Sequence, residues 1–370
     1  MKSILKVVVL FLLISLQDCN VTSPCNQLDS TCNPISSLVL ERQIRSSRNP
    51  LTFLPVGGTY RFDQFVSIVS GTQASVIRYT TDGSEPTCWN GSVYTDPIPL
   101  VGAKTHLLKA AVCVDSMVAN TKTDQYIVSQ SPLSAPNLRF WYSADSIGTQ
   151  NGMEVKVWND FSGSGNHLYT SSISSSNPTL VANALNGKPS VRFNSNQKQF
   201  MNTRTMNGYT GAKTGTGVMV LKKYSSQSEE VYFSIGSLGN SVNARNWRAN
   251  LSNPSICSSL SPSPANCAAA ANTAISTTTY SVILFTIDSA GAVTYYHNGV
   301  TDGTSTLATP TSFSAANTML LGSGLNVSTF LDAEILEVLF FEQGFDVTGI
   351  NVVHCYIQSK YGLAVGTNCQ

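Results

Sequence analysis

Charged side chains are scarce in this sequence. Only 12% of its 370 residues are Asp, Glu, Lys or Arg, and the formal net charge is +1. So weak a field does not attract nucleic acid or an anionic membrane surface. The chain is not disordered by composition, because 42% of its residues are apolar and disordered chains combine low hydrophobicity with high charge. We therefore expect a folded protein of about two domains with no nucleic-acid partner.

The sequence also lacks an apolar run of the roughly 18–20 residues that a helix needs to span a membrane. Its most apolar stretch, Val7–Leu16, is shorter and follows Lys2 and Lys6, which is typical of an export signal. We predict an export signal over residues 1–19. Residues 20–50 are rich in Ser, Asn, Pro and Cys without a regular period, and we predict a tether there.

The segment Ser15–Asn20 resembles a bacterial lipobox, in which the cysteine becomes the lipidated N-terminus after cleavage. Cys19 is the lipidation candidate, and Leu16 lies where that motif requires an aliphatic residue. Asp18 departs from the motif, because the residue before the cysteine is normally small and uncharged. The alternative is ordinary cleavage within residues 16–23. The predicted location is therefore the bacterial outer membrane or cell surface, if the protein is a lipoprotein, or the medium, if it is secreted. The only predicted contact with a membrane is through this lipid anchor.

Nine cysteines are many for a cytosolic protein and ordinary for an exported one. Proximity along the chain predicts local disulfides and leaves Cys19 over. The predicted pairs are Cys25–Cys32, Cys88–Cys113, Cys257–Cys267 and Cys355–Cys369. There is no pair of cysteines at zinc-binding spacing, and the four histidines are scattered, so we predict no metal site.

Residues 51–129 contain short β-like runs with turns every 8–12 residues, which is typical of a small β-sandwich. Asp82-Gly83 favours a tight turn, and Pro86 stiffens the same corner. The strings Y-T-T-D-G-S-E-P-T (79–87), S-V-Y (92–94), P-I-P-L (97–100) and L-K-A-A-V (108–112) resemble the module at the C-terminus of bacterial chitobiases and β-hexosaminidases. This resemblance implies a non-catalytic, immunoglobulin- or fibronectin III-like sandwich over residues 51–131, which serves as a spacer.

Two prolines mark Ser129–Pro136 as a linker. The chain beyond it is again β-like, apart from a helix predicted over Val347–Lys360 with Asp346 or Thr348 as N-cap and Gly362 at its end. The strings W-N-D-F-S-G-S-G-N (158–166) and N-G-K-P-S-V-R-F (186–193) resemble the concanavalin A-like, laminin G-like domains of bacterial surface proteins. The resemblance implies a larger jelly-roll sandwich over residues 136–365. It leaves calcium open as a ligand, because some laminin G-like domains bind it. We predict no other cofactor.

The acidic residues do not form a recognisable catalytic pair. Jelly rolls of this shape include glucanases, whose E-x-D-x-E strand aims three acids into one cleft, and retaining hydrolysis needs two carboxyl groups about 5–5.5 Å apart. The nearest string here runs from Glu334 to Glu337 and lacks the central acid. Strict alternation places Glu334 and Leu336 on one face of the strand and Glu337 on the other. We therefore predict no catalytic residue.

Trp247 lies in the polar run N-A-R-N-W-R-A-N, and we predict that it is an exposed aromatic residue that stacks on a ligand. Arg245, Asn246 and Arg248 beside it are predicted to supply hydrogen bonds. Trp141 and Trp158, in strand-like surroundings, are predicted core residues.

The sequence as a whole favours an exported, non-catalytic, adhesin-like binding protein of the cell surface. Its expected partner is a glycan or a host or matrix glycoprotein, bound by the larger domain. Two alternatives stay open, a divergent glycoside hydrolase on the jelly-roll domain and a structural envelope protein.

The substitution Cys19→Ser tests the lipid anchor. If Cys19 is lipidated, the variant should move from the membrane fraction to the soluble fraction, because the acyl chains that hold the protein in the bilayer are lost. Cell fractionation followed by immunoblotting measures this, with Cys25→Ser as the control that should leave the distribution unchanged. Unaltered partitioning of the Cys19→Ser protein contradicts lipidation.

Overall fold

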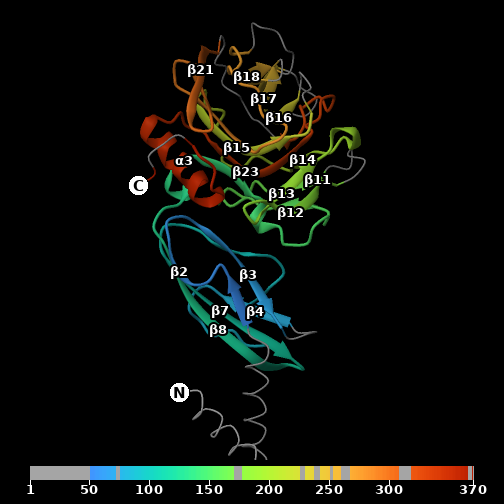
Figure 1. Cartoon of the computed structure of the whole chain (residues 1–370), viewed down its shortest axis with the longest axis vertical. Coiled ribbons are helices and arrows are strands. Elements are labelled where there is room, and N and C mark those ends of the chain that lie inside the picture. Colours follow the sequence, from blue (N-terminus) through green and yellow to red (C-terminus); the bar gives the residue numbers. More distant parts are fainter. Residues whose placement is uncertain are drawn as a thin grey trace, which may run out of the picture.

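The computed structural model describes residues 51–71, 76–170, 177–225, 230–236, 242–250, 253–259, 267–307, 318–365 and 369. The predicted export signal, the tether, Cys19 and the predicted Cys25–Cys32 pair lie outside the described residues. The predicted all-β fold is confirmed, with a small sandwich followed by a larger one (Figure 1). Among the described residues, no helix is long and apolar enough to span a membrane.

The small sandwich contains a three-stranded and a five-stranded sheet. The first has the order β1 (Leu51–Leu54), β3 (Gln64–Ser70) and β6 (Ile98–Leu100). The second has the order β2 (Gly58–Tyr60), β8 (Met117–Val128), β7 (Thr105–Val114), β4 (Val76–Thr80) and β5 (Ser92–Val93). Alternation turns one face of each sheet inward. The core between them contains Phe53, Val66, Leu100, Leu108, Val112 and Tyr126.

The larger sandwich contains two sheets whose inner faces pack on each other. The seven-stranded sheet has the order β10 (Val157–Trp158), β11 (Leu168–Thr170), β14 (Met201–Thr203), β22 (Thr318–Leu321), β16 (Val231–Gly236), β17 (Val242–Asn250) and β18 (Asn253–Ser259). The eight-stranded sheet has the order β12 (Thr179–Leu185), β13 (Lys188–Phe193), β23 (Ala333–Phe341), β15 (Gly215–Lys223), β19 (Ser281–Ile287), β20 (Ala292–His297) and β21 (Val300–Thr306), and β9 (Leu138–Ser143) pairs with β23.

Three short 3₁₀ helices and one α-helix complete the described fold: η1 (Pro132–Ser134), η2 (Ala144–Ser146), η3 (Ser195–Gln197) and α3 (Val347–Tyr361). The predicted helix is confirmed, and Asp346 is its N-cap, since its carboxylate accepts the N–H of Gly349 at 2.9 Å. Gly362 ends it with a φ of 68°, which only glycine adopts without strain. Helix α3 packs its buried side against the outer face of the eight-stranded sheet (Figure 1).

The motif at residues 158–166 is a tied loop. The carboxylate of Asp160 accepts the backbone N–H groups of Trp141 at 2.9 Å, Ser162 at 2.9 Å and Asn166 at 2.8 Å. The side chain of Asn166 in turn donates to the carbonyl of Arg139 at 2.7 Å. These bonds connect the loop to β9, so the polar residues of the string hold the backbone in place.

Strand β23 contains a bulge that the sequence did not predict. Val220 of β15 pairs with Glu337 and the next residue, Leu221, pairs with Ile335, so Leu336 is an extra residue. A bulge of this kind shifts the alternation by one position. Glu337 therefore lies on the outer face of the sheet together with Leu336, and the prediction that the two residues face opposite sides is wrong.

Disulfides form at three of the four predicted places, Cys88–Cys113, Cys257–Cys267 and Cys355–Cys369. The Cys257–Cys267 bridge aligns the segment after Cys267 with β18. Ala268 donates its N–H to the carbonyl of Ile256 at 3.0 Å, and Ala271 donates to that of Pro254 at 2.8 Å. The end of the predicted insert thus continues the seven-stranded sheet beyond β18.

An aromatic contact joins the two sandwiches. Phe65 of β3 meets the ring of Phe161 at a centroid distance of 4.9 Å and the ring of Trp141 at 6.2 Å. Phe62 meets Tyr356 of α3 at 5.2 Å. All three pairs are edge-on, the arrangement that aromatic rings favour in cores. The small sandwich therefore shares a buried apolar cluster with the outer face of the larger one.

Asp63 is buried beside this junction. Its carboxylate accepts the N–H of Gly102 at 2.5 Å and hydrogen-bonds with Ser131 of the linker. Burial raises the pKa of Asp63 to about 6 from 3.8, although the two hydrogen bonds and the charge of Lys360 act in the opposite direction. Near neutral pH the junction therefore contains a carboxylate whose burial is unfavourable.

The substitution Asp63→Asn should change how stability depends on pH. The raised pKa means that the folded protein keeps a proton between about pH 4 and pH 6 that the unfolded chain has lost, so stability falls as pH rises through this window. A shift of roughly two pKa units corresponds to about 3 kcal/mol. Asp63→Asn should lack this loss, and urea unfolding of both proteins from pH 4 to pH 7.5 measures it.

The difference between the wild-type and Asp63→Asn stability curves reports the titration of Asp63 alone. His106, whose side chain lies 3.3 Å from the carbonyl of Gly102, has a pKa lowered by burial and titrates in both. Parallel stability curves for the wild type and Asp63→Asn would contradict the assignment.

Candidate functional site

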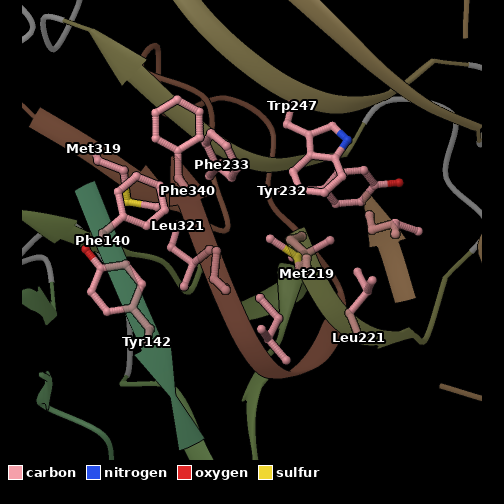
Figure 2. Packing of buried hydrophobic residues seen from close by; sticks show 14 of the residues in the cluster. Phe140, Tyr142, Met219, Leu221, Tyr232, Phe233, Trp247, Met319, Leu321 and Phe340 are labelled. Carbon is pink, nitrogen blue, oxygen red and sulfur yellow. The ribbon is translucent and has the colours of Figure 1, made fainter. Parts of the chain in front are cut away.

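Trp247 is not exposed. Its side chain has no accessible surface and lies in the core between the two sheets of the larger sandwich (Figure 2). The ring of Phe285 meets it at 4.7 Å and that of Phe233 at 5.6 Å, both edge-on. Strand β17 pairs with β16 on one side and β18 on the other, so it is an interior strand of its sheet. The prediction is wrong because the inward face of an interior strand is buried, whatever the polarity of its neighbours in sequence.

The three polar neighbours of Trp247 are also buried. Arg245 donates to the carbonyl of Ala212 at 2.7 Å and that of Lys213 at 3.0 Å. Asn246 accepts a hydrogen bond from Ser234 at 2.6 Å, and Arg248 lies on the same strand with almost no accessible surface. All three side chains are shielded from solvent, so they do not form the exposed ligand surface that the sequence predicted.

The acidic side chains of β23 accept hydrogen bonds from other side chains of the larger sandwich. Glu334 accepts the hydroxyl groups of Tyr224 and Tyr280, and that of Ser190 at 3.0 Å. Burial alone raises the pKa of Glu334, but these hydrogen bonds and the charge of Lys222 outweigh it, and the net pKa is lowered. Glu334 is therefore ionised, and its carboxylate oxygens already accept hydrogen bonds. A general acid must hold a proton to donate, so Glu334 is unsuitable for that role.

Glu342, after the end of β23, has a similar environment. Its carboxylate accepts a hydrogen bond from Arg139 Nε at 2.7 Å. It also accepts hydrogen bonds from the backbone N–H groups of Thr210 at 2.9 Å and Ala212 at 2.8 Å. Burial acts to raise the pKa of Glu342, and the hydrogen bonds lower it below its usual value. Among the described residues, no three His, Cys, Asp or Glu side chains are grouped so that they could hold a metal ion.

The exposed tryptophan of this chain is Trp89, in the small sandwich. Its side chain is 79% exposed, whereas Trp141, Trp158 and Trp247 are all at 0%. The predicted burial of Trp141 and Trp158 is confirmed. A tryptophan left almost fully in water is unusual, because its large apolar surface favours burial. Trp89 is therefore the strongest candidate for a residue kept at the surface for contact with a partner.

Several contacts hold the corner that carries Trp89. The disulfide Cys88–Cys113 connects the residue before Trp89 to β7. The hydroxyl of Thr87 accepts the N–H of Trp89 at 3.2 Å and that of Asn90 at 3.0 Å. On the other side, Arg78 of β4 donates to the carbonyl of Gly91 at 2.8 Å. The backbone on both sides of Trp89 is thus fixed to the sheet.

Strand register shows which face of the five-stranded sheet the corner covers. Val76 pairs with Cys113 and Arg78 pairs with Val93, so these four residues share one face. It is the outer face, because Ile77 between them packs on the core. Val76 and Val93 are each about half exposed. The Cys88–Cys113 disulfide and the Arg78–Gly91 hydrogen bond tie the corner to this face. We call Val76, Val93 and Arg78, together with Trp89 on the corner, the Trp89 face.

The sequence contained a signal for Trp89 that was not used. Trp89 directly follows a cysteine and precedes Asn90-Gly91, inside a turn-rich segment with no alternation that would bury a side chain. Trp247 was chosen because charged and amide residues surround it. Turn context is the better indicator of exposure here, because a residue in a strand is exposed only if its face of the sheet is uncovered.

Two hollows lie near the junction of the sandwiches. The larger has a volume of about 450 Å³, and its lining includes Pro132, Pro136, Gln343, Phe345, Asp346, Val352 and Tyr356. The smaller, of about 260 Å³, lies among Asp96, Ile147, Met153, Glu154 and Lys156. The larger is mainly apolar, and neither presents an exposed aromatic ring comparable to Trp89.

Residues 55–123 match the family model of the chitobiase/β-hexosaminidase C-terminal domain. The predicted resemblance of the small sandwich to this module is confirmed. The Trp89 face and the Cys88–Cys113 disulfide both lie inside the matched range. The match covers less than a fifth of the 370 residues and does not include the larger sandwich.

Solved structures similar to this chain are distant from it. The binding domain of botulinum neurotoxin serotype D has 13% identity and a TM-score of 0.39, covering 59% of this chain and 51% of that one. The binding domain of Paraclostridial Mosquitocidal Protein 1 has 13% identity and a TM-score of 0.42, covering 60% and 52%. Domain 4 of AbnA, an extracellular arabinanase of Geobacillus stearothermophilus, solved in complex with arabinotriose, has 16% identity and a TM-score of 0.42, covering 58% and 96%.

This chain spans about half the length of the two toxin domains that it matches. At TM-scores below 0.5, these likenesses are too distant to assign a ligand. No curated protein matches the sequence.

The exposure of Trp89 can be tested by chemical modification. Under native conditions N-bromosuccinimide should oxidise a single tryptophan of the four, because three are shielded in cores. Trp89→Phe should remove the reactive site, whereas Trp247→Phe should leave it, and mass spectrometry of peptides locates the oxidised residue. Rapid oxidation of any of the other three in the folded wild type would contradict the arrangement described here.

Proposed function

We propose that this chain is an exported, non-catalytic binding protein that recognises glycans through the Trp89 face. The observation that carries the proposal is the 79% exposure of Trp89 on a corner held by a disulfide. Three disulfides among the described residues indicate that the protein folds in an oxidising compartment. A place at the bacterial cell surface, with or without a lipid anchor at Cys19, is part of the same proposal.

The chemistry of the Trp89 face suits a sugar ring. A pyranose presents a flat face of C–H groups, and an indole ring offers a flat apolar surface with little side-chain entropy to lose. Val76 and Val93 extend the apolar area on the same face of the sheet. Arg78 is on this face and Asn90 follows Trp89 in the corner. Guanidinium and amide groups of this kind hydrogen-bond with sugar hydroxyls.

Preorganisation supports binding at this place. Exposed loops usually lose entropy when they close on a ligand, and this loss weakens binding. Here the disulfide, the Thr87 hydroxyl and the Arg78 guanidinium fix the corner before a ligand arrives. Lys109 of β7 also pairs with Glu85 in the same corner. Little of the affinity from stacking would therefore be lost to ordering of the loop.

The small sandwich is assigned a different role from the one that the sequence predicted. It was expected to serve as a spacer, and it now carries the proposed contact, because the four residues predicted on the larger sandwich are buried. Its match to a family named for chitobiases and β-hexosaminidases fits a module that works next to carbohydrates. We retain as part of the proposal that the larger sandwich is concanavalin A-like or laminin G-like.

Binding is favoured over glycoside hydrolysis by the state of the acidic residues. Glu334, Glu337 and Glu342 each accept several hydrogen bonds within the scaffold and have almost no accessible surface. Hydrolysis requires one carboxyl group that can give up a proton and a second one across the substrate. Incubation with a polysaccharide panel and detection of reducing ends tests this alternative directly, and we expect no release.

Trp89→Ala should weaken glycan binding. Loss of a central tryptophan at a binding surface costs about 2 kcal/mol or more, so affinity should fall by at least about thirtyfold. A glycan array with the full chain identifies the ligand, and isothermal titration calorimetry then compares the variants. Trp89→Phe should retain part of the affinity, because a smaller aromatic ring still stacks.

Tyr224→Ala is the matched control, since Tyr224 is an exposed aromatic residue of the larger sandwich. It should bind as the wild type does. Equal affinities for Trp89→Ala and the wild type would contradict the assignment of the site, and no glycan binding at high micromolar concentration would leave the structural-protein alternative.

A further inference from the structure

Lys360, Asp145 and Glu337 meet on the outer face of the eight-stranded sheet, beside α3, although they come from distant parts of the chain. Lys360 is in the last turn of α3, Asp145 is in η2 directly after β9, and Glu337 is in β23. The Lys360 Nζ atom lies 2.8 Å from Glu337 Oε2 and 3.5 Å from Asp145 Oδ2. The three side chains are 5%, 0% and 6% exposed, in the order Lys360, Glu337, Asp145.

Aromatic side chains surround this group. The Lys360 Nζ atom lies 5.1 Å from the ring centre of Phe65, 5.5 Å from that of Tyr356 and 5.2 Å from that of Tyr361. Water has little access, and taking charged groups out of water costs several kcal/mol for each ion unless the compensation is nearly complete. An amide bond between the lysine and one carboxyl group is uncharged, so its formation would remove one positive and one negative charge from this buried group.

Glu337 is fixed relative to Lys360. Its carboxylate accepts the indole N–H of Trp141 at 2.5 Å, the hydroxyl of Tyr361 at 2.5 Å and the hydroxyl of Tyr356. Burial raises the pKa of both tyrosines well above the usual value, with the nearby Glu337 charge acting in the same direction, so both stay protonated as donors. Glu337 is therefore held with one oxygen against the Lys360 Nζ atom.

We propose that Lys360 and Asp145 become joined by an intramolecular amide bond between Lys360 Nζ and Asp145 Cγ. Glu337 takes part as the group that accepts a proton from Lys360 and passes it on. This would be a covalent modification site formed by the chain on itself, and it does not depend on the proposed glycan binding.

The reaction balances without a co-reactant. Lys360 gives one ammonium proton to Glu337, and the nitrogen lone pair of the resulting amine attacks Asp145 Cγ. The new C–N bond forms as a C–O bond of Asp145 breaks. The departing oxygen takes up two of the three ammonium protons, one of them through Glu337, and leaves as water. An ammonium and a carboxylate are thus converted to an amide and one water molecule, with no oxidation or reduction.

Proximity and charge favour this reaction. A lysine amine is a nucleophile once it has lost its proton, and Glu337 Oε2, 2.8 Å from the Lys360 Nζ atom, is placed to accept that proton. Reacting atoms held at near-contact distance gain a large effective concentration. Lys188, whose Nζ lies 3.1 Å from Asp145 Oδ2, is placed to stabilise the negative charge that develops on the Asp145 oxygen during attack. Its side chain is 32% exposed and stays hydrated, so we assign the nucleophile to Lys360.

The bond would join the two ends of the larger sandwich. Asp145 follows β9, the first strand of this sandwich, and Lys360 is near the end of α3, the last element described. The strands from β10 to β23 lie between them in the sequence. The cross-link would therefore close the larger sandwich into a covalent ring, and force applied through the chain would bypass its strands.

Peptide mass spectrometry of the full exported chain tests the proposal. After reduction and alkylation, the denatured protein is digested with trypsin and a glutamate-specific protease. Cleavage after Arg139, Glu154 and Glu342 should yield fragments 140–154 and 343–370 as one cross-linked species, lighter by one water molecule than their sum. Trypsin cannot cut after a lysine whose side chain is an amide. The proposal is overturned if separate fragments 140–154, 343–360 and 361–370 are found instead.

Variants assign the participants. Lys360→Arg and Asp145→Ala should lose the cross-linked species entirely, whereas Lys213→Arg, at an exposed lysine with no part in the reaction, should retain it. Glu337→Gln should lack the cross-link or form it more slowly than the wild type after refolding. An unchanged rate of cross-link formation would overturn the role of Glu337. A cross-link that maps to Lys188 would overturn the assignment of Lys360. The wild-type digest decides the main point even if a variant does not fold.

Discussion

The hydrogen-bonded carboxylate of Glu337 is the contact on which the arrangement of the two sandwiches depends. It orients Trp141 and Tyr356 by accepting hydrogen bonds from both side chains. In the small sandwich, Phe65 packs against the Trp141 ring and Phe62 packs against the Tyr356 ring. Without an acceptor beneath them, the indole N–H and the phenol would be buried without a partner, at a cost of about 1–3 kcal/mol each. The bulge at Leu336 is what turns Glu337 toward these donors. One extra residue in β23 thus determines how the modules meet.

The same use of carboxylates recurs through the molecule. Asp160 ties a loop to β9, Glu342 joins the end of β23 to residues 210–212, and Glu334 gathers two tyrosines and a serine. In a chain with so few charged residues, most of the buried acids hold backbone or aromatic groups in place. In the binding role proposed above, recognition falls to apolar and aromatic surface such as Trp89.

Local features could be predicted from the sequence, and features that depend on distant strands could not. The caps of α3 at Asp346 and Gly362 and the disulfide pairs are decided within a few tens of residues, so their patterns were sufficient. The burial of Trp247 depends on β16 and β18 on either side of its strand and on the opposite sheet. The direction of Glu337 depends on a bulge that alternation cannot reveal. The exposure of Trp89 was missed because the polar neighbours of Trp247 were given more weight than the turn that carries Trp89.

The segment that follows Cys267 has a consequence for self-association. Strand β18 is the last strand of the seven-stranded sheet, and an open strand at such a position can pair with the edge of another copy. The Cys257–Cys267 bridge keeps residues 268–271 along β18, where their N–H groups occupy carbonyls that a second chain would otherwise use. Reducing conditions would free this segment and uncover a row of acceptors, so the oxidised bridge protects the protein from stacking edge to edge at high local density.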